Sequence, residues 1–112
     1  MNNSILLTIK KLLGIPEDVT AFDTDIIVAI NTAMSSASQL GFGDFKVSYS
    51  ISGSSETWSD YIGEETNLEM LKTYIYLKTR LLFDPPQSSA VMEAFKNSIG
   101  ELEFRIQSVT DF

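Results

Sequence analysis

Two amphipathic stretches lie on either side of the sequence Asp84-Pro85-Pro86, and together they predict an antiparallel helical hairpin. In residues 67–83, apolar side chains recur at helical spacing over roughly half of the helix circumference. A stripe this wide predicts a central helix with several neighbours. Thr66 and Glu69 have the spacing of a helix cap at its start, and the two prolines, which have no backbone N–H, predict the turn after it.

Residues 89–107 predict the second helix of the hairpin, with Ser88 or Ser89 as its cap. Its apolar stripe is about 100° wide and consists of Val91, Met92, Phe95, Ile99, Leu102 and Ile106. A narrow stripe predicts a peripheral helix with one buried face. Phe104 lies on roughly the opposite side, so it either contacts a partner protein or lies against the tail of its own chain.

Two earlier helices are expected at residues 4–13 and 24–40. Ser4 can cap the first helix, Lys10 and Lys11 suit its last turn, and Gly14 ends it. Its apolar face favours core packing over membrane binding. The second helix ends at Gly41, and its predicted buried face consists of Ile26, Ile30, Ala33, Met34, Ala37 and Leu40.

The opposite face of the 24–40 helix has small polar side chains and no charge: Asn31, Thr32, Ser35, Ser38 and Gln39. A helix face in bulk water usually carries Lys and Glu, so this face is interpreted as a subunit contact, with a plain solvent-facing helix as the alternative. Asp23-Thr24-Asp25 resembles an acidic metal-binding pair, but capping and the helix dipole account for carboxylates in a first turn. No metal site is therefore predicted.

Between residues 42 and 59 the hydrophobic period changes from helical to alternating. Phe45, Val47, Tyr49 and Ile51 alternate with polar residues, as in a half-buried strand, and 53–55 supply a turn. Residues 56–59 could return as a short second strand. The segment is therefore expected to be a β-hairpin or an extended loop, with Trp58 anchored either in the core or in an interface.

Taken together, the pattern predicts a mainly α single domain of 112 residues. The expected architecture is a small antiparallel bundle of about four helices, with the hairpin or loop between the second and third. Residues 108–112 are expected to form a C-terminal tail, whose Phe112 is suited to dock into a partner. The residues predicted to contact other proteins are Asn31, Ser35, Ser38, Tyr49, Trp58, Phe104 and Phe112.

Composition restricts the chemistry. The chain has 8 basic and 15 acidic residues, a net charge of −7, and neither cysteine nor histidine. Stable nucleic-acid binding is not expected without a basic patch, and the commonest general base and metal ligands are missing. No enzyme activity and no cofactor are predicted. Neither a secretion signal nor a membrane span is expected, so the predicted location during synthesis is the cytoplasm.

Several stretches resemble the head-tail connector proteins of tailed bacteriophages. They are KTYIYLKTRLLFDPP at 72–86, SSAV at 88–91, ELEFR at 101–105 and the opening IKKLLGI at 9–15. The resemblance is strongest around the two prolines, and the family has no enzymatic signature. It implies a ring of subunits in the virion neck that binds the portal and a tail-proximal neck or stopper protein and leaves a path for DNA. The alternative is an acidic binding module, either a DNA-mimic inhibitor or a small regulator of a host protein.

Overall fold

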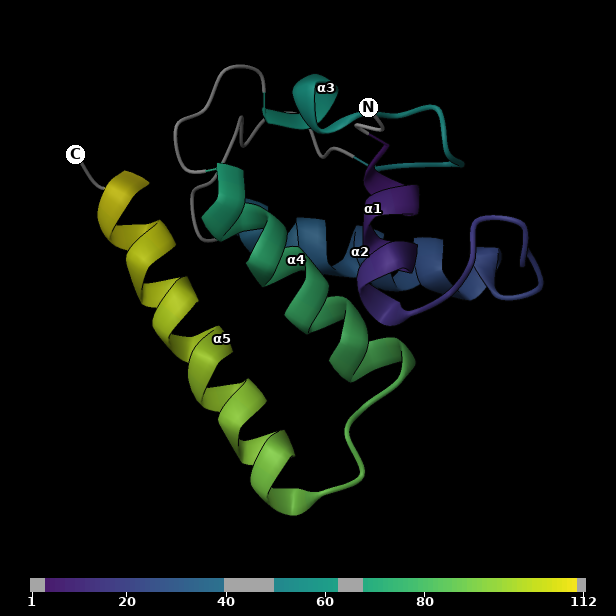
Figure 1. Ribbon diagram of the computed structural model, residues 1–112. Helices are drawn as coiled ribbons and strands as arrows, with labels where there is room; N and C mark the ends of the chain where they lie inside the picture. Colours follow the sequence, from purple (N-terminus) through teal and green to yellow (C-terminus); the bar gives the residue numbers. More distant parts are fainter. Residues whose placement is uncertain (1–3, 40–49, 63–67, 111–112) are drawn as a thin grey trace.

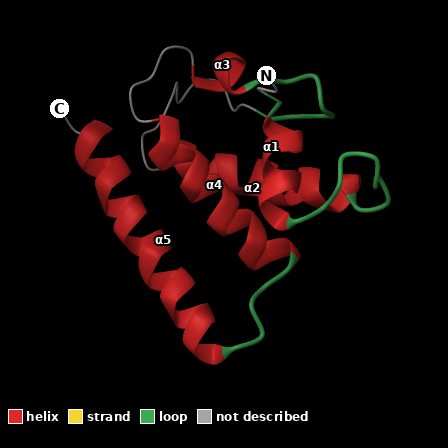
Figure 2. Cartoon of the chain, viewed as in Figure 1, coloured by secondary structure: helices red, strands yellow, loops and turns green. Residues whose placement is uncertain are grey.

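The computed structural model describes residues 4–39, 50–62 and 68–110, and these form five helices (Figures 1 and 2). The helices are α1 (Ile5–Leu13), α2 (Asp23–Gln39), α3 (Trp58–Ile62), α4 (Leu68–Phe83) and α5 (Ser89–Thr110). No strand occurs among the described residues. The predicted mainly α bundle is therefore confirmed, with one short helix more than the pattern indicated.

The ends of α1 are those that the sequence predicts. The Oγ of Ser4 accepts a hydrogen bond from the backbone N–H of Leu7 at 3.2 Å, which satisfies one of the free donors at the helix start. Gly14 follows the last turn with φ 80°, the left-handed conformation that glycine adopts without strain. Its N–H donates to the carbonyl of Lys11 at 3.1 Å.

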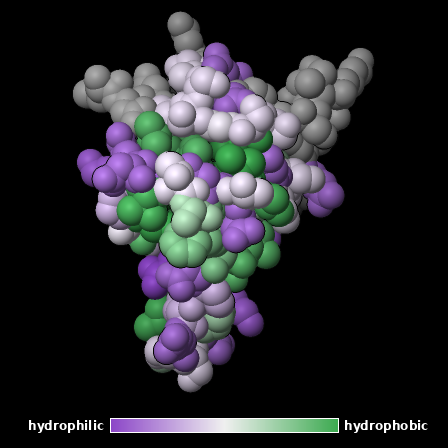
Figure 3. All heavy atoms as spheres, turned by 90° about the vertical axis from the view of Figure 1, so that its right-hand side faces the viewer, coloured by the Kyte–Doolittle hydropathy of each residue, from purple (hydrophilic) through white to green (hydrophobic). Residues whose placement is uncertain are grey.

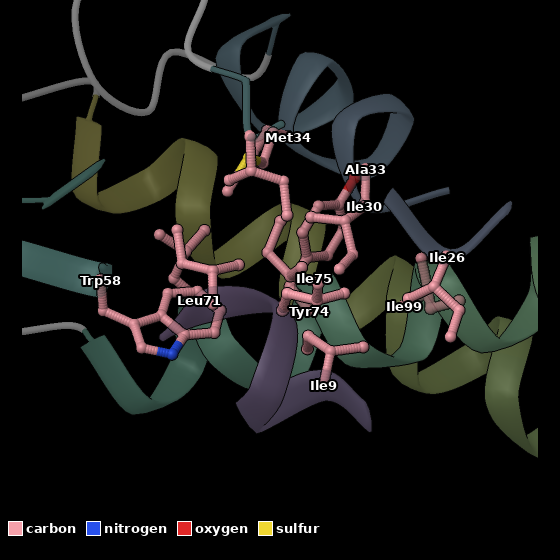
Figure 4. Close-up of a cluster of buried hydrophobic side chains, with 14 residues drawn as sticks. Ile9, Ile26, Ile30, Ala33, Met34, Trp58, Leu71, Tyr74, Ile75 and Ile99 are labelled. Atoms are coloured by element: carbon pink, nitrogen blue, oxygen red, sulfur yellow. The ribbon is translucent and has the colours of Figure 1, made fainter. Parts of the chain in front are cut away.

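Helix α4 is central, as its wide apolar stripe predicts, because it packs against α1, α2 and α5. Leu71, Tyr74 and Ile75 are fully buried between these neighbours. Figure 4 shows their side chains pointing toward residues of α1 and α2. The buried core consists of Ile5, Leu6, Ile9, Ile26, Ile30, Ala33, Met34, Ala37, Ile51, Trp58, Leu71, Tyr74, Ile75 and Ile99. The predicted inner face of α2 is thus confirmed at every described position.

Lys10 is wholly buried and joins α1 to the start of α2. Its ammonium group donates to the carbonyls of Glu17 at 3.1 Å and Val19 at 2.7 Å, and lies 2.8 Å from a carboxylate oxygen of Asp23. A buried ammonium needs such compensation, because removing it from water without partners is costly. The sequence indicated only a favourable place for Lys10 in the last helical turn, whereas the structure uses it to hold the 15–22 loop.

The predicted return strand at 56–59 is wrong. Thr57 makes one isolated antiparallel bridge with Ser4, and the chain then enters α3 at Trp58. The cause is a reciprocal cap: the Thr57 N–H donates to the Asp60 carboxylate and the Asp60 N–H donates to the Thr57 hydroxyl, both at 3.1 Å. The first predicted strand, including Phe45, Val47 and Tyr49, lies outside the described residues.

Helix α5 runs antiparallel to α4 and packs mainly against it (Figure 1). Of its described side chains only Ile99 is buried, in agreement with the predicted peripheral helix, but Val91 of the predicted buried stripe is 43% exposed because it lies in the first turn, at the free end of the hairpin. The helix continues to Thr110, so the predicted tail at 108–112 is helical for its first three residues. The reason is local, because no proline or glycine follows Gly100 to end the helix.

Candidate functional site

An open groove lies where the interface between α2 and α4 ends, and we call it the α2–α4 groove. It has a volume of about 700 Å³ and is lined by Phe22, Asp25, Val28, Ala29, Thr32, Leu82, Phe83 and Asp84. Its walls therefore come from α2 as far as Thr32, from the last two residues of α4, and from Phe22 and Asp84 next to these helices. Most of the lining is apolar, and its charged members are both acidic.

The apolar character of the groove follows from where the core stops. At about 100° per residue, Leu82 lies on the same face of α4 as the buried Leu71 and Ile75. However, Leu82 stands in the last turn, beyond the residues of α2 that cover that face, and it is 55% exposed. Phe22 is 48% exposed and meets the ring of Phe83 edge-on, with the ring centroids 6.0 Å apart. The groove is the open end of the core.

A second hollow continues along the outer face of α2. It has a volume of about 490 Å³ and is lined by Val28, Asn31, Thr32, Ser35, Ser36 and Gln39. Val28 belongs to both hollows and is 60% exposed. The Thr32 hydroxyl donates to the Val28 carbonyl at 2.9 Å, and the Ser36 hydroxyl to the Thr32 carbonyl at 3.2 Å. Because these hydroxyls are already bonded, this face can lose water at little cost.

Asn31 stands at the edge of this face and is used within the chain. Its amide nitrogen donates to the Ile51 carbonyl at 3.0 Å, and its amide oxygen accepts from the Ile51 N–H at 2.8 Å. This pair of bonds holds Ile51, and with it the segment 50–57, against α2. Ser35 is exposed on the same face. A role of Asn31 and Ser35 in binding another protein stays a prediction.

Trp58 belongs to the core, so the core alternative holds for it. It is 2% exposed, and its indole N–H donates to the Thr8 hydroxyl at 3.2 Å. The ammonium group of Lys72 lies 5.5 Å from the ring centroid, a cation–π distance. Trp58 thus ties α3 to α1 and α4.

Phe104 is 71% exposed on the outer side of α5, the largest exposure of any large apolar residue in the described chain. On the inner side of the helix, the Tyr74 hydroxyl donates to the Glu103 carboxylate at 3.0 Å. Burial, and then the bond to Glu103, raise the pKa of Tyr74. The side chain of Ser38 and the residues Tyr49 and Phe112 lie outside the described part, so their predicted contacts stay predictions.

Exposed apolar side chains are distributed over several elements: Leu12, Val19, Phe22, Val28, Leu82, Val91 and Phe104. Figure 3, which views the molecule from the right of Figure 1, shows hydrophobic atoms in a band across the middle of that face. Sequence reasoning missed Phe22, Val28 and Leu82. The signal for Val28 was present, since helical spacing places it among Asn31, Thr32 and Ser35.

The acidic pair at the start of α2 has a structural use. Asp23 is the ion-pair partner of Lys10, and Asp25 is exposed beside the α2–α4 groove. Within the described ranges, no group of three or more His, Cys, Asp or Glu residues could hold a metal ion. Over the same residues, no helix is both long and apolar enough to span a bilayer.

Comparison with known proteins identifies a family for the chain. A family model described as phage connector protein matches residues 5–111. The match covers all five helices and confirms the resemblance that the stretch around the two prolines indicated. Searches of curated proteins and of solved structures gave no match.

Proposed function

The chain belongs to the phage connector protein family, and on this premise we propose that it is a head-tail connector in the neck of a tailed phage virion. Copies of the chain associate side by side into a ring below the portal. The ring joins the portal to a tail-proximal neck or stopper protein and leaves a path for DNA. The chain acts by contact and not by catalysis. The family match over residues 5–111 is the observation that carries this proposal.

Two separate surfaces support contacts with two kinds of partner, a neighbouring copy and the portal. One is the outer face of α2 with Val28 and Ser35, and the other is the outer side of α5 with Phe104. In Figure 1, the C-terminal half of α5 lies at the left, whereas the start of α2 and the end of α4 lie toward the right. Such a separation lets the outer face of α2 contact a neighbouring copy in a ring while α5 contacts the portal.

The charge of the chain supports a passage for DNA. With a net charge of −7, an assembly of many copies repels the phosphate backbone and does not hold it. The C-terminal part of α5 is the segment that we assign to the portal, since Phe104 is its exposed anchor. Aromatic residues of this kind frequently dominate the binding energy of a protein interface.

Electron microscopy of the purified chain mixed with its cognate portal tests the proposal. The expected result is a discrete collar of the chain on one end of the portal. Failure to associate at any concentration tested would contradict it and favour the acidic regulator. Salt provides a second readout, because a DNA mimic should release its target steeply as salt rises, whereas a collar held by apolar and small polar contacts should persist.

A further inference from the structure

We propose that the α2–α4 groove binds a segment of another protein that presents large apolar side chains flanked by arginine or lysine. Val28, Leu82 and Phe22 line one hollow and are each about half exposed to water, at 60%, 55% and 48%. Apolar side chains that gather in a concave site are stabilised when a partner covers them. The groove therefore has the character of a docking site for side chains and not of solvated surface.

The groove is shaped before any partner arrives. The edge contact between Phe22 and Phe83 fixes one wall, and Ala29, which is only 5% exposed, lies in another. The last turn of α4 is held by the Asp84 N–H, which donates to the Arg80 carbonyl at 2.8 Å. A preformed site avoids the entropy cost of ordering loops when the partner binds.

The charges of the groove define the partner. Asp25 and Asp84 are the charged residues of its lining, and both side chains are exposed. Neither nearby cation forms an ion pair with these carboxylates. Lys10 is buried against Asp23, and the Arg80 guanidinium lies 5.3 Å from the centroid of the Phe95 ring and donates to the backbone carbonyl of Asp84 at 3.4 Å. A basic side chain on each flank of an apolar segment would thus meet a carboxylate.

The same charges argue against the exposed α5 surface of a second copy as the occupant. Phe104 of a second copy would bring Glu101, one turn away on the same side, toward Asp25 and Asp84. Its basic neighbour Arg105 is already paired with Glu101 at 2.6 Å. The paired side chains have no net charge, so this surface offers Asp25 and Asp84 no free cation. That the occupant belongs to a neighbouring virion protein rests on the proposed function; the apolar and basic chemistry rests on the groove alone.

Two synthetic amphipathic helical peptides test this inference on the full chain labelled with ¹⁵N. Both carry the same leucines, and the flanking positions hold arginine in one peptide and glutamate in the other. We expect the arginine peptide to shift the amide resonances of Val28, Thr32 and Leu82. The glutamate peptide should bind at least ten times more weakly, because it meets Asp25 and Asp84 with like charge.

Matched variants distinguish peptide binding in the groove from nonspecific binding to other exposed apolar side chains. Leu82→Ser should weaken binding of the arginine peptide at least tenfold, whereas Leu12→Ser should leave it unchanged, since Leu12 is 50% exposed but outside the groove. Asp84→Asn should weaken binding several-fold. Glu69→Gln is its control, because it removes the same charge at the other end of α4.

Three outcomes would overturn the inference. They are equal binding of both peptides, resonance shifts that avoid the groove or do not occur, and shifts of Leu82 and Phe83 that grow with protein concentration in the absence of peptide. The last outcome would assign the groove to a second copy. The portal experiment above is independent, so a chain that forms collars but ignores the arginine peptide would lose this inference and keep the proposed function.

Discussion

The three helices α1, α2 and α4 and the single helix α5 are built in different ways. In the first group, residues from all three helices are fully buried, and the buried Lys10 bonds the loop between α1 and α2. Helix α5 is the longest, with 22 residues, yet among its described side chains only Ile99 is buried. The three-helix group therefore provides most of the folding free energy, and α5 mainly presents surface.

This difference explains where the exposed apolar side chains can be tolerated. A helix with one neighbour keeps an outer side that folding does not use, and Phe104 stands there. In the three-helix group, exposed apolar residues occur where the packing ends, as Leu82 does in the last turn of α4. Substitutions of core residues in the three-helix group should therefore lower stability more than substitutions in α5.

The largest expected difference in stability is between two isoleucine-to-alanine substitutions, one in each region. Ile30→Ala should lower the free energy of unfolding by about 4 kcal/mol, because Ile30 is fully buried between helices that cannot close the cavity. Ile99→Ala should cost about 2 kcal/mol, since α5 can move toward α4. Urea unfolding followed by circular dichroism measures both. Equal losses would show that α5 is an integral part of the core.

Removing the buried cation should have the next largest effect. Lys10→Met leaves Asp23 and the carbonyls of Glu17 and Val19 without their donor, so we expect a loss of about 3 kcal/mol in the free energy of unfolding. Lys11→Met is the control and should change stability by less than about 0.5 kcal/mol, because Lys11 is exposed. A mild effect at Lys10 would mean that the loop is held by other contacts.

The hydrogen bond between Tyr74 of α4 and Glu103 of α5 can be removed by a single substitution. Tyr74→Phe deletes the hydroxyl that donates to Glu103, and should cost about 1 kcal/mol, since Glu103 is partly exposed and can bond water instead. Hydrogen exchange should then become faster in α5 while α2 keeps its protection. Faster exchange spread evenly over both helices would contradict a separate docking of α5.

A smaller loss of stability is expected at low pH. The Glu56 carboxylate accepts bonds from the Ser52 N–H at 2.8 Å and the Ser52 hydroxyl at 2.9 Å. These bonds, the backbone one first, hold the pKa of Glu56 below the ordinary value of 4.5. A lowered pKa stabilises the fold above the unfolded-state value, and this contribution is lost as pH falls through the folded-state value.

Comparison of the wild type with Glu56→Gln isolates the contribution of the Glu56 carboxylate to stability. Melting temperatures of the wild type and of Glu56→Gln should differ at pH 7 and converge as pH falls below the folded-state pKa of Glu56, where the wild-type carboxyl also becomes protonated. A constant difference at all pH values would show that the carboxylate charge is unimportant. This turn lies in the segment that Asn31 holds against α2, away from α5, so α5 exchange should be unaffected.

Much of the fold could be predicted because its signals are local. Ser4 and Gly14 mark the ends of α1, the prolines mark the end of α4, and helical spacing identifies the inner face of α2. Helix α3 was missed because residues 56–59 were interpreted as a short return strand after the turn at 53–55, although the spacing of Thr57 and Asp60 was a capping signal. Local capping overrode the strand pattern there.

The remaining differences between the sequence-based predictions and the structure depend on tertiary structure. Burial of Lys10 requires carbonyl groups from a loop whose path helical spacing does not describe. Exposure of Leu82 requires knowing where α2 stops covering α4, and its place on the wide stripe predicted the opposite. The predicted interface residues differ from these cases, because the structure of a single chain does not test them. Contacts with other proteins at Ser35 and Phe104 stay predictions.

The most direct test of the account is one substitution measured in two ways. Phe104→Ser should leave the melting temperature within about 2 °C of the wild type, because the side chain is 71% exposed, and a surface change alters stability little. The same variant should form markedly fewer collars on the cognate portal, as counted by electron microscopy. A large fall in melting temperature with undiminished collars would contradict the claim that α5 serves assembly.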